Sequence, residues 1–83
     1  MSQKLPQVSG QAVLRLLQGL GYEVIRQRGS HVRLRKLTDA GEHKITVPVH
    51  KTVAKGTLSD ILSRVSVWNA ISKENVTERL RRK

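Results

Sequence analysis

Residues 26–36 hold the side chains of this chain that are best suited to act on a phosphate ester. Five basic residues occur in these eleven positions, without an acidic one: Arg26, Arg28, Arg33, Arg35 and Lys36. His31 stands in the middle of them. Guanidinium groups bind phosphate oxygens in a bidentate manner, and imidazole is the side chain that exchanges protons most readily near neutral pH. The segment therefore predicts contacts to a nucleic-acid backbone, with His31 as the candidate for proton transfer.

Cleavage of RNA needs little more than this set of groups. Attack of the 2′-hydroxyl on the neighbouring phosphodiester requires only proton transfers and stabilisation of negative charge. Gly29 and Ser30 come directly before His31, and a glycine in a turn allows another backbone or a phosphate to approach closely. An inert histidine on a solvated basic face is the alternative, and the spacing alone does not distinguish the two.

The alternation of residues 31–35 predicts which side chains share a face. Val32 and Leu34 alternate with His31, Arg33 and Arg35, and successive side chains of a strand point to opposite faces. Burial of the two apolar residues therefore turns the histidine and both arginines outward together.

The segment 44–49 can be interpreted in the same way. If its apolar residues are buried, the side chains that point outward are Thr46, Pro48 and His50. Antiparallel pairing then places His31 opposite either His50 or Pro48, so the two imidazoles become direct or diagonal neighbours. His50 is the candidate second proton carrier, and a structural role at the end of the strand is the alternative.

Two lysines extend the positive charge beyond the expected strands. Lys51 and Lys55 lie near the expected start of a helix, where free N–H groups and the helix dipole favour an anion. We expect a further phosphate contact there, and a merely solubilising loop is the alternative. The third histidine, His43, falls in an expected turn and is predicted to be solvated.

The remaining site chemistry is limited by what the chain lacks. Its histidines follow no metal-ligand spacing, and its six acidic residues do not cluster, so we expect no metal. No glycine motif for nucleotide phosphates and no nucleophile elbow occurs, so we expect no small-molecule cofactor. The chain has no cysteine, which excludes disulfides and thiolate ligands.

Helices and strands of an α+β fold must position these residues. The predicted order is a helix between Ser9 and Gly21, strands over 22–27, 31–37 and 44–49 with turns at 28–30 and 38–43, a second helix that begins near Thr57, and a short third helix after Ser72. Pro48 favours an edge strand because it cannot donate to a ladder. We expect one three-stranded antiparallel sheet with helices packed on one face.

The helix boundaries rest on capping residues and apolar spacing. Ser9 is a suitable N-cap and Gly21 a suitable C-cap for the first helix. Thr57 and Asp60 resemble a capping box with Asp in place of Glu. The apolar residues that follow at helical spacing are Leu58, Ile61, Leu62 and Val65.

Composition supports a polyanion as partner. The 83 residues carry a formal net charge of +10, which attracts nucleic acid. One Trp, one Tyr and no Phe leave almost no surface for base stacking, so phosphate contacts should dominate. No apolar run is long enough to span a membrane, and residues 1–5 lack the apolar segment of a secretory signal, so we expect a cytoplasmic protein.

Several short motifs together resemble one family. They are Gly21-Tyr22, Arg26-Gln27-Arg28-Gly29-Ser30-His31, Val47-Pro48-Val49-His50, Lys55-Gly56-Thr57-Leu58 and Ile61-Leu62. In order and spacing they resemble the HicA toxins, the mRNA interferases of HicA/HicB toxin-antitoxin pairs. The resemblance covers about residues 4–65 of a single domain over 1–83, and leaves 66–83 as a C-terminal extension.

The resemblance implies a fold, an activity and a partner. The fold is similar to a double-stranded-RNA-binding domain, and the activity is that of an endoribonuclease that cleaves mRNA and so inhibits translation and growth. The partner is a HicB-like antitoxin. The family's catalytic histidine corresponds to His31, with Gly29 and Ser30 shaping its turn. The alternatives from the residues are a non-catalytic RNA-binding module that uses the same basic face, and a protein whose charge serves only to bind an acidic partner.

Overall fold

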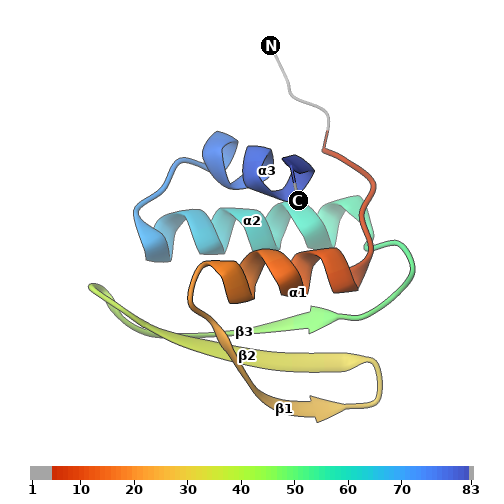
Figure 1. The fold of residues 1–83 in the computed structure, drawn as a ribbon, viewed down its shortest axis with the longest axis horizontal. Coiled ribbons are helices and arrows are strands. Elements are labelled where there is room, and N and C mark those ends of the chain that lie inside the picture. Colours follow the sequence, from red (N-terminus) through yellow and green to blue (C-terminus); the bar gives the residue numbers. More distant parts are fainter. Residues whose placement is uncertain (1–4, 83) are drawn as a thin grey trace.

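Three helices cover one face of a three-stranded sheet in the computed structural model, which describes residues 5–82 (Figure 1). The elements are α1 (Gly10–Gly19), β1 (Glu23–Arg28), β2 (His31–Thr38), β3 (Gly41–Pro48), α2 (Lys55–Asn69) and α3 (Lys73–Arg82). The predicted α+β order and the arrangement similar to a double-stranded-RNA-binding domain are confirmed. Residues 1–4, on which the expectation about a secretory signal mainly rests, lie outside the described residues.

Helix α1 begins after the predicted N-cap Ser9, and its C-cap residue is Leu20, one position before the predicted Gly21. The Ser9 hydroxyl accepts the N–H of Ala12 at 3.2 Å, which satisfies one free donor of the first turn. The helix ends at Gly19, and Gly21 then takes a φ of 102°, which favours glycine. Val13 and Leu17 are buried, so this face of α1 packs against the core.

The sheet has the strand order β1-β2-β3 and is antiparallel throughout. Strand β3 is therefore an edge strand, as Pro48 indicates. The second turn is shorter than the predicted 38–43, since Asp39 and Ala40 alone form it. Gly41 (φ 118°) supports this tight turn, and the Thr38 hydroxyl donates to the carbonyl oxygen of Gly41 at 2.8 Å. Strand β3 consequently begins three residues earlier than predicted.

Strand β1 contributes no buried side chain. Its register against β2 shifts between Val24 and Arg26, so Ile25 lies in a bulge. Two adjacent apolar residues cannot share one face of a regular strand, and here Val24 and Ile25 are both about half exposed. The bulge returns Arg26 and Arg28 to the same face as His31.

The start of α2 differs from the prediction. The helix begins at Lys55, Ala54 is its N-cap residue, and no side chain caps it, so Thr57 and Asp60 do not form a capping box. The N–H of Val53 donates to the carbonyl oxygen of Val8 at 2.9 Å, which fixes the chain just before the helix and lets it start earlier. The short third helix is confirmed as α3, with Ser72 accepting the N–H of Asn75 at 3.0 Å.

One hydrophobic core lies between the helices and the sheet. It includes Leu34 and Val47 from the sheet, Leu62 from α2 and Leu80 from α3. The predicted stripe of α2 is buried in it, and the side chains of α3 join the same core. The helices therefore shield only one face of the sheet, and the other face is open to solvent.

Candidate functional site

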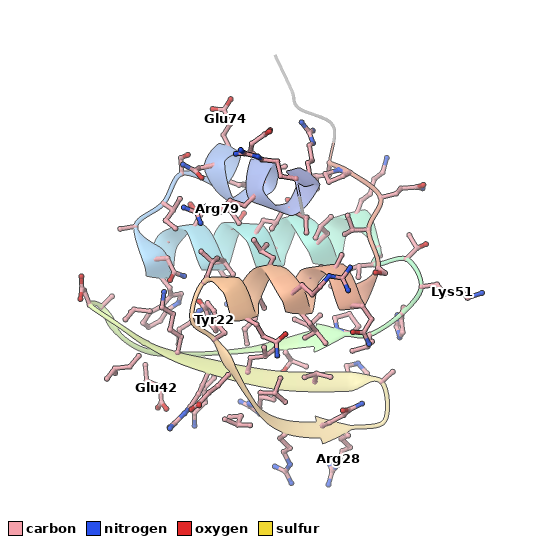
Figure 2. All side chains as sticks on the ribbon, viewed as in Figure 1. Tyr22, Arg28, Glu42, Lys51, Glu74 and Arg79 are labelled. Atoms are coloured by element: carbon pink, nitrogen blue, oxygen red, sulfur yellow. The ribbon has the colours of Figure 1, made fainter. Side chains whose placement is uncertain are left out.

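The open face of the sheet carries the predicted row of polar side chains. In β2, Val32 and Leu34 are buried while His31, Arg33 and Arg35 are exposed. The strand register places one residue of β1 and one of β3 beside each of these side chains. His31 lies between Arg28 and Pro48, and Arg33 lies between Arg26 and Thr46. Arg35 lies between Glu23 and Lys44. Figure 2 shows Arg28 pointing away from the helical layer. The alternation thus gathers side chains from three strands on one surface.

A shallow hollow of about 140 Å³ lies at one end of this face. We call it the arginine hollow, and its lining residues are Arg26, Arg28, His31, Arg33 and Thr46. Three guanidinium groups and one imidazole therefore border a single depression, without a carboxylate in its lining. Such a surface attracts a phosphate group and can hold it beside the imidazole.

The His50 side chain lies close to His31, although His50 comes after the last residue of β3. The register places His31 opposite Pro48, and the ring centroids of His31 and His50 are 6.4 Å apart in an edge-on arrangement. The two imidazoles are therefore diagonal neighbours, one of the two arrangements that strand parity allows. The Ser30 hydroxyl lies 3.5 Å from Nε2 of His50, which links the Gly-Ser turn to the second imidazole.

The backbone around His50 is held by α1 and by the first turn. The N–H of Gly10 donates to the carbonyl oxygen of His50 at 2.9 Å, and the N–H of Val49 donates to that of Ser30 at 2.6 Å. A Cβ at Gly10 would lie 2.4 Å from the carbonyl oxygen of Pro48. Only glycine allows the first turn of α1 to lie this close to the end of β3, and this contact positions His50.

Arg35 lies on the same face but in a different charge environment. Its guanidinium forms ion pairs with Glu23 at 3.1 Å and with Glu42 at 3.0 Å. The hydrogen bond to Glu23 makes the largest contribution to raising the pKa of Arg35, and the hydrogen bond to Glu42 raises this pKa further. Arg35 does not line the arginine hollow, and an incoming phosphate would have to compete with two carboxylates.

Lys51 and Lys55 lie away from the arginine hollow. Lys51 is exposed on the loop between β3 and α2 and points into solvent (Figure 2), and Lys55 is the exposed first residue of α2. Neither residue lines the hollow. The structure therefore separates the predicted basic residues into the hollow, the paired Arg35 and a second group at the helix start.

The prediction of a solvated His43 is wrong. His43 lies on β3, is only 4% exposed, and stacks on Trp68 with ring centroids 4.8 Å apart. The reason is the early start of β3, which gives His43 the same inward direction as Ile45 and Val47. Strand alternation predicts a buried His43 when the third strand is taken to begin at residue 41 instead of 44.

A hydrogen-bond chain connects the buried His43 to Tyr22, Asn69 and Lys36. The side-chain amide of Asn69 donates to the Tyr22 oxygen at 2.9 Å, so the Tyr22 hydroxyl can donate to Nδ1 of His43, 2.6 Å away. Lys36 in turn donates to the side-chain oxygen of Asn69. Burial, and secondarily the charge of Arg64, lowers the pKa of His43, and burial also raises the pKa of Tyr22. No motif or spacing in the sequence indicated that Trp68 and Asn69 would contact His43 and Tyr22.

The described residues include no group of three or more His, Asp or Glu side chains that could hold a metal ion. Among residues 5–82, no helix is both long and apolar enough to cross a membrane. The lining of the arginine hollow offers an imidazole that can transfer protons and guanidinium groups that can stabilise negative charge.

Comparison with known proteins assigns the chain to a family. Residues 10–67 match the family model described as the HicA toxin of bacterial toxin-antitoxin systems. This chain belongs to the HicA toxin family. No curated protein and no solved structure matches it significantly. The matched region of this HicA protein runs from the start of α1 almost to the end of α2, so it includes the whole open face. Membership of a toxin-antitoxin family implies a cognate antitoxin.

Proposed function

We propose that this HicA protein is an endoribonuclease that cleaves mRNA without a metal ion, with His31 as general acid or base. The observation that carries the proposal is the position of His31 in a hollow with Arg26, Arg28 and Arg33. Cleavage of mRNA inhibits translation and growth, and this effect would explain why the protein acts as a toxin. Such an enzyme acts where mRNA is translated, so its site of action is the cytoplasm.

The proposed reaction is a transesterification within the RNA. A base removes the proton of the 2′-hydroxyl, its oxygen bonds to phosphorus, the bond from phosphorus to the 5′-oxygen breaks, and an acid protonates that oxygen. The products are a 2′,3′-cyclic phosphate and a 5′-hydroxyl end. The arginines of the hollow stabilise the extra negative charge on the phosphate. His50 is the proposed second proton carrier, since its ring faces His31 at 6.4 Å between centroids.

The test compares wild-type protein, His31→Ala and Lys44→Ala on a long mRNA in EDTA. Lys44 is exposed on the same face but outside the arginine hollow, so its variant is the matched control. We expect cleavage by wild type and Lys44→Ala, and a loss of about 100-fold or more in His31→Ala. Circular dichroism verifies folding, and mass spectrometry identifies the cyclic phosphate. Wild-type cleavage by a folded His31→Ala protein would remove His31 from the mechanism.

A non-catalytic RNA-binding module is the second candidate function. The observation in its favour is that the His31 ring makes no hydrogen bond within residues 5–82 that would fix its orientation. This candidate predicts salt-dependent binding of RNA with no turnover by wild-type protein. The same cleavage assay decides between the two, because only the enzyme produces fragments.

We further propose that the antitoxin is HicB-like and acts by covering the arginine hollow. A basic toxin and an acidic partner associate rapidly, and a covered hollow excludes RNA. Diethylpyrocarbonate, which modifies exposed imidazoles, should react with His31 in the free toxin and not in the complex. Equal modification of His31 in both would contradict inhibition by direct cover.

A further inference from the structure

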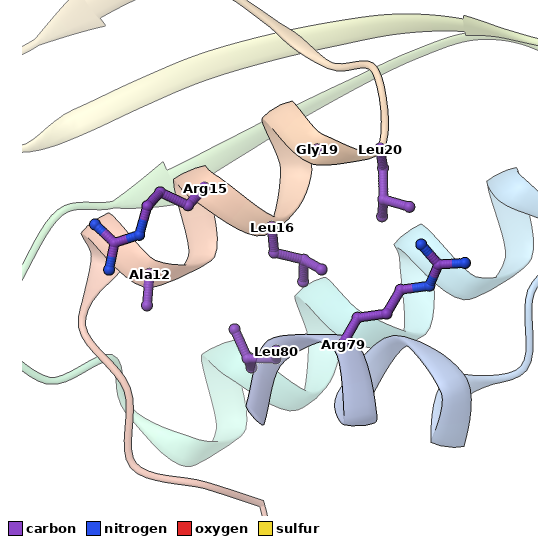
Figure 3. A pocket seen from close by; sticks show the side chains of 7 residues that line it. All are labelled: Ala12, Arg15, Leu16, Gly19, Leu20, Arg79 and Leu80. Atoms are coloured by element: carbon purple, nitrogen blue, oxygen red, sulfur yellow. The ribbon is translucent and has the colours of Figure 1, made fainter. Parts of the chain in front are cut away.

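Besides the arginine hollow on the sheet, the protein has a depression in its helical layer. It lies between α1 and α3 and has a volume of about 450 Å³. Its lining residues are Ala12, Arg15, Leu16, Gly19, Leu20, Arg79 and Leu80 (Figure 3). We call it the α1/α3 groove. Arg79 and Leu80 lie beyond the matched residues 10–67, so the groove depends on a helix outside the matched region.

The floor of the α1/α3 groove is aliphatic. Ala12 and Leu16 of α1 and its C-cap residue Leu20 follow one another at four-residue spacing, and they remain partly exposed while packing on the core. Leu80 closes the opposite side from α3. Gly19 leaves a gap in the wall, since a Cβ there would meet no atom within 4 Å. Such a strip accepts apolar side chains from another helix.

The two ends of the groove are positively charged. Figure 3 shows Arg15 and Arg79 at opposite ends, with Leu16 and Leu80 between them. Within residues 5–82 neither arginine forms an ion pair with a carboxylate. Arg79 donates to the neutral side chain of Asn75 at 3.1 Å. Both guanidinium groups can therefore donate hydrogen bonds to carboxylates of a ligand.

We infer that the α1/α3 groove binds a short amphipathic helix of a partner protein, with leucine-like side chains at its centre and carboxylates at both ends. One charged group, as in a fatty acid, would satisfy only one of the two arginines. An RNA backbone would leave the aliphatic floor unused, and no aromatic ring lines the groove for base stacking. His31 faces away from the helical layer, so this docking is independent of the proposed cleavage.

The test uses a fluorescein-labelled helical peptide with leucines at positions i, i+3, i+4 and i+7 and glutamates at both ends. A scrambled peptide of the same composition controls for attraction by the net charge alone. Fluorescence polarisation measures binding to wild type, Arg15→Glu, Gly19→Gln and Arg82→Glu. Gly19→Gln fills the groove from an open helical position, and Arg82→Glu is the control with the same change of charge outside the lining.

We expect the amphipathic peptide to bind wild type and Arg82→Glu equally, and Arg15→Glu and Gly19→Gln at least about tenfold more weakly. Chemical-shift changes in ¹⁵N-labelled protein should fall on α1 and α3. Equal binding of the scrambled peptide, equal weakening by Arg82→Glu, or shift changes confined to the open face would overturn the inference. So would a dimer in sedimentation that Gly19→Gln dissociates, since a second copy would then occupy the groove.

The RNA-cleavage assay separates this inference from the proposed function. Saturating peptide should leave cleavage by wild-type protein unchanged, because the groove lies in the helical layer (Figures 1 and 3) and the arginine hollow lies on the open face of the sheet. A protein that fails to cleave RNA can still bind the peptide, and one that cleaves RNA can fail to bind it.

Discussion

The three histidines of this chain lie in two different kinds of surroundings. His31 and His50 are exposed and face each other near arginines, whereas His43 is buried against Tyr22 and Trp68. Exposed imidazoles are accessible to a substrate and can exchange protons with it. The buried imidazole instead accepts a hydrogen bond, and the neutral form suits that environment.

The buried histidine predicts a loss of stability in mild acid. Its pKa in the folded protein lies below the value of about 6.5 expected for the unfolded chain. Below about pH 6.5 the unfolded state therefore binds the extra proton first, so stability falls as the pH falls, while above this pH His43 contributes fully. Urea unfolding of wild type at pH 7.5 and pH 5.5 should show a lower midpoint at pH 5.5.

His43→Phe is the variant that isolates this effect. Phenylalanine keeps an aromatic ring for Trp68 but cannot accept the hydrogen bond of Tyr22, so we expect a cost of about 1–3 kcal/mol at pH 7.5. The drop in midpoint between pH 7.5 and pH 5.5 should be smaller in the variant than in wild type. An identical drop in both proteins would show that other groups control the pH dependence.

At the level of elements, the contact between α1 and the end of β3 links the fold to the site. Gly10 is buried there, and its N–H holds the backbone of His50. Gly19, at the other end of the same helix, has open space around it. The two glycines therefore have different reasons to occur in α1, and substitution by alanine distinguishes them.

We expect opposite changes of stability from the two substitutions. Gly10→Ala places a methyl group against the carbonyl oxygen of Pro48 and should destabilise by about 1–3 kcal/mol. Gly19→Ala removes backbone freedom from the unfolded chain and should stabilise by up to about 1 kcal/mol. Thermal unfolding followed by circular dichroism measures both, and a neutral Gly10→Ala would show that α1 does not depend on this close approach.

For the whole molecule, we expect the net charge of +10 to control association with the proposed RNA substrate. Not every cation contributes equally, since the Arg35 guanidinium is already paired with Glu23 and Glu42. Arg33 lies in the arginine hollow and has no such partner in the described part of the chain. Counterion release on binding should therefore reflect the hollow more than the paired end of the open face.

The salt dependence of RNA binding tests this difference. In the His31→Ala background, which we expect to suppress cleavage, Arg33→Ala should reduce the slope of log K against log salt by about 0.7 for single-stranded RNA, the value of one lost phosphate contact. Arg35→Ala should change the slope much less. Equal changes for both arginines would show that RNA displaces the carboxylates from Arg35.

The sequence by itself determined the features that depend on local geometry. The outward row of His31, Arg33 and Arg35 follows from strand alternation, which the covalent backbone imposes on any strand. The apolar face of α2 follows from helical spacing in the same way. Strand parity also brought His31 and His50 together before the register was known.

Only the tertiary structure decided the features that depend on pairing between distant segments. The turn at residues 39 and 40 is short, so β3 begins at Gly41 and includes His43. Strand alternation then places the His43 side chain in the core. Glu23 and Glu42 reach Arg35 only across three paired strands. The α1/α3 groove exists because two helices far apart in the sequence pack on one core. A local pattern cannot specify such contacts, since their free energy comes from packing partners that the pattern does not contain.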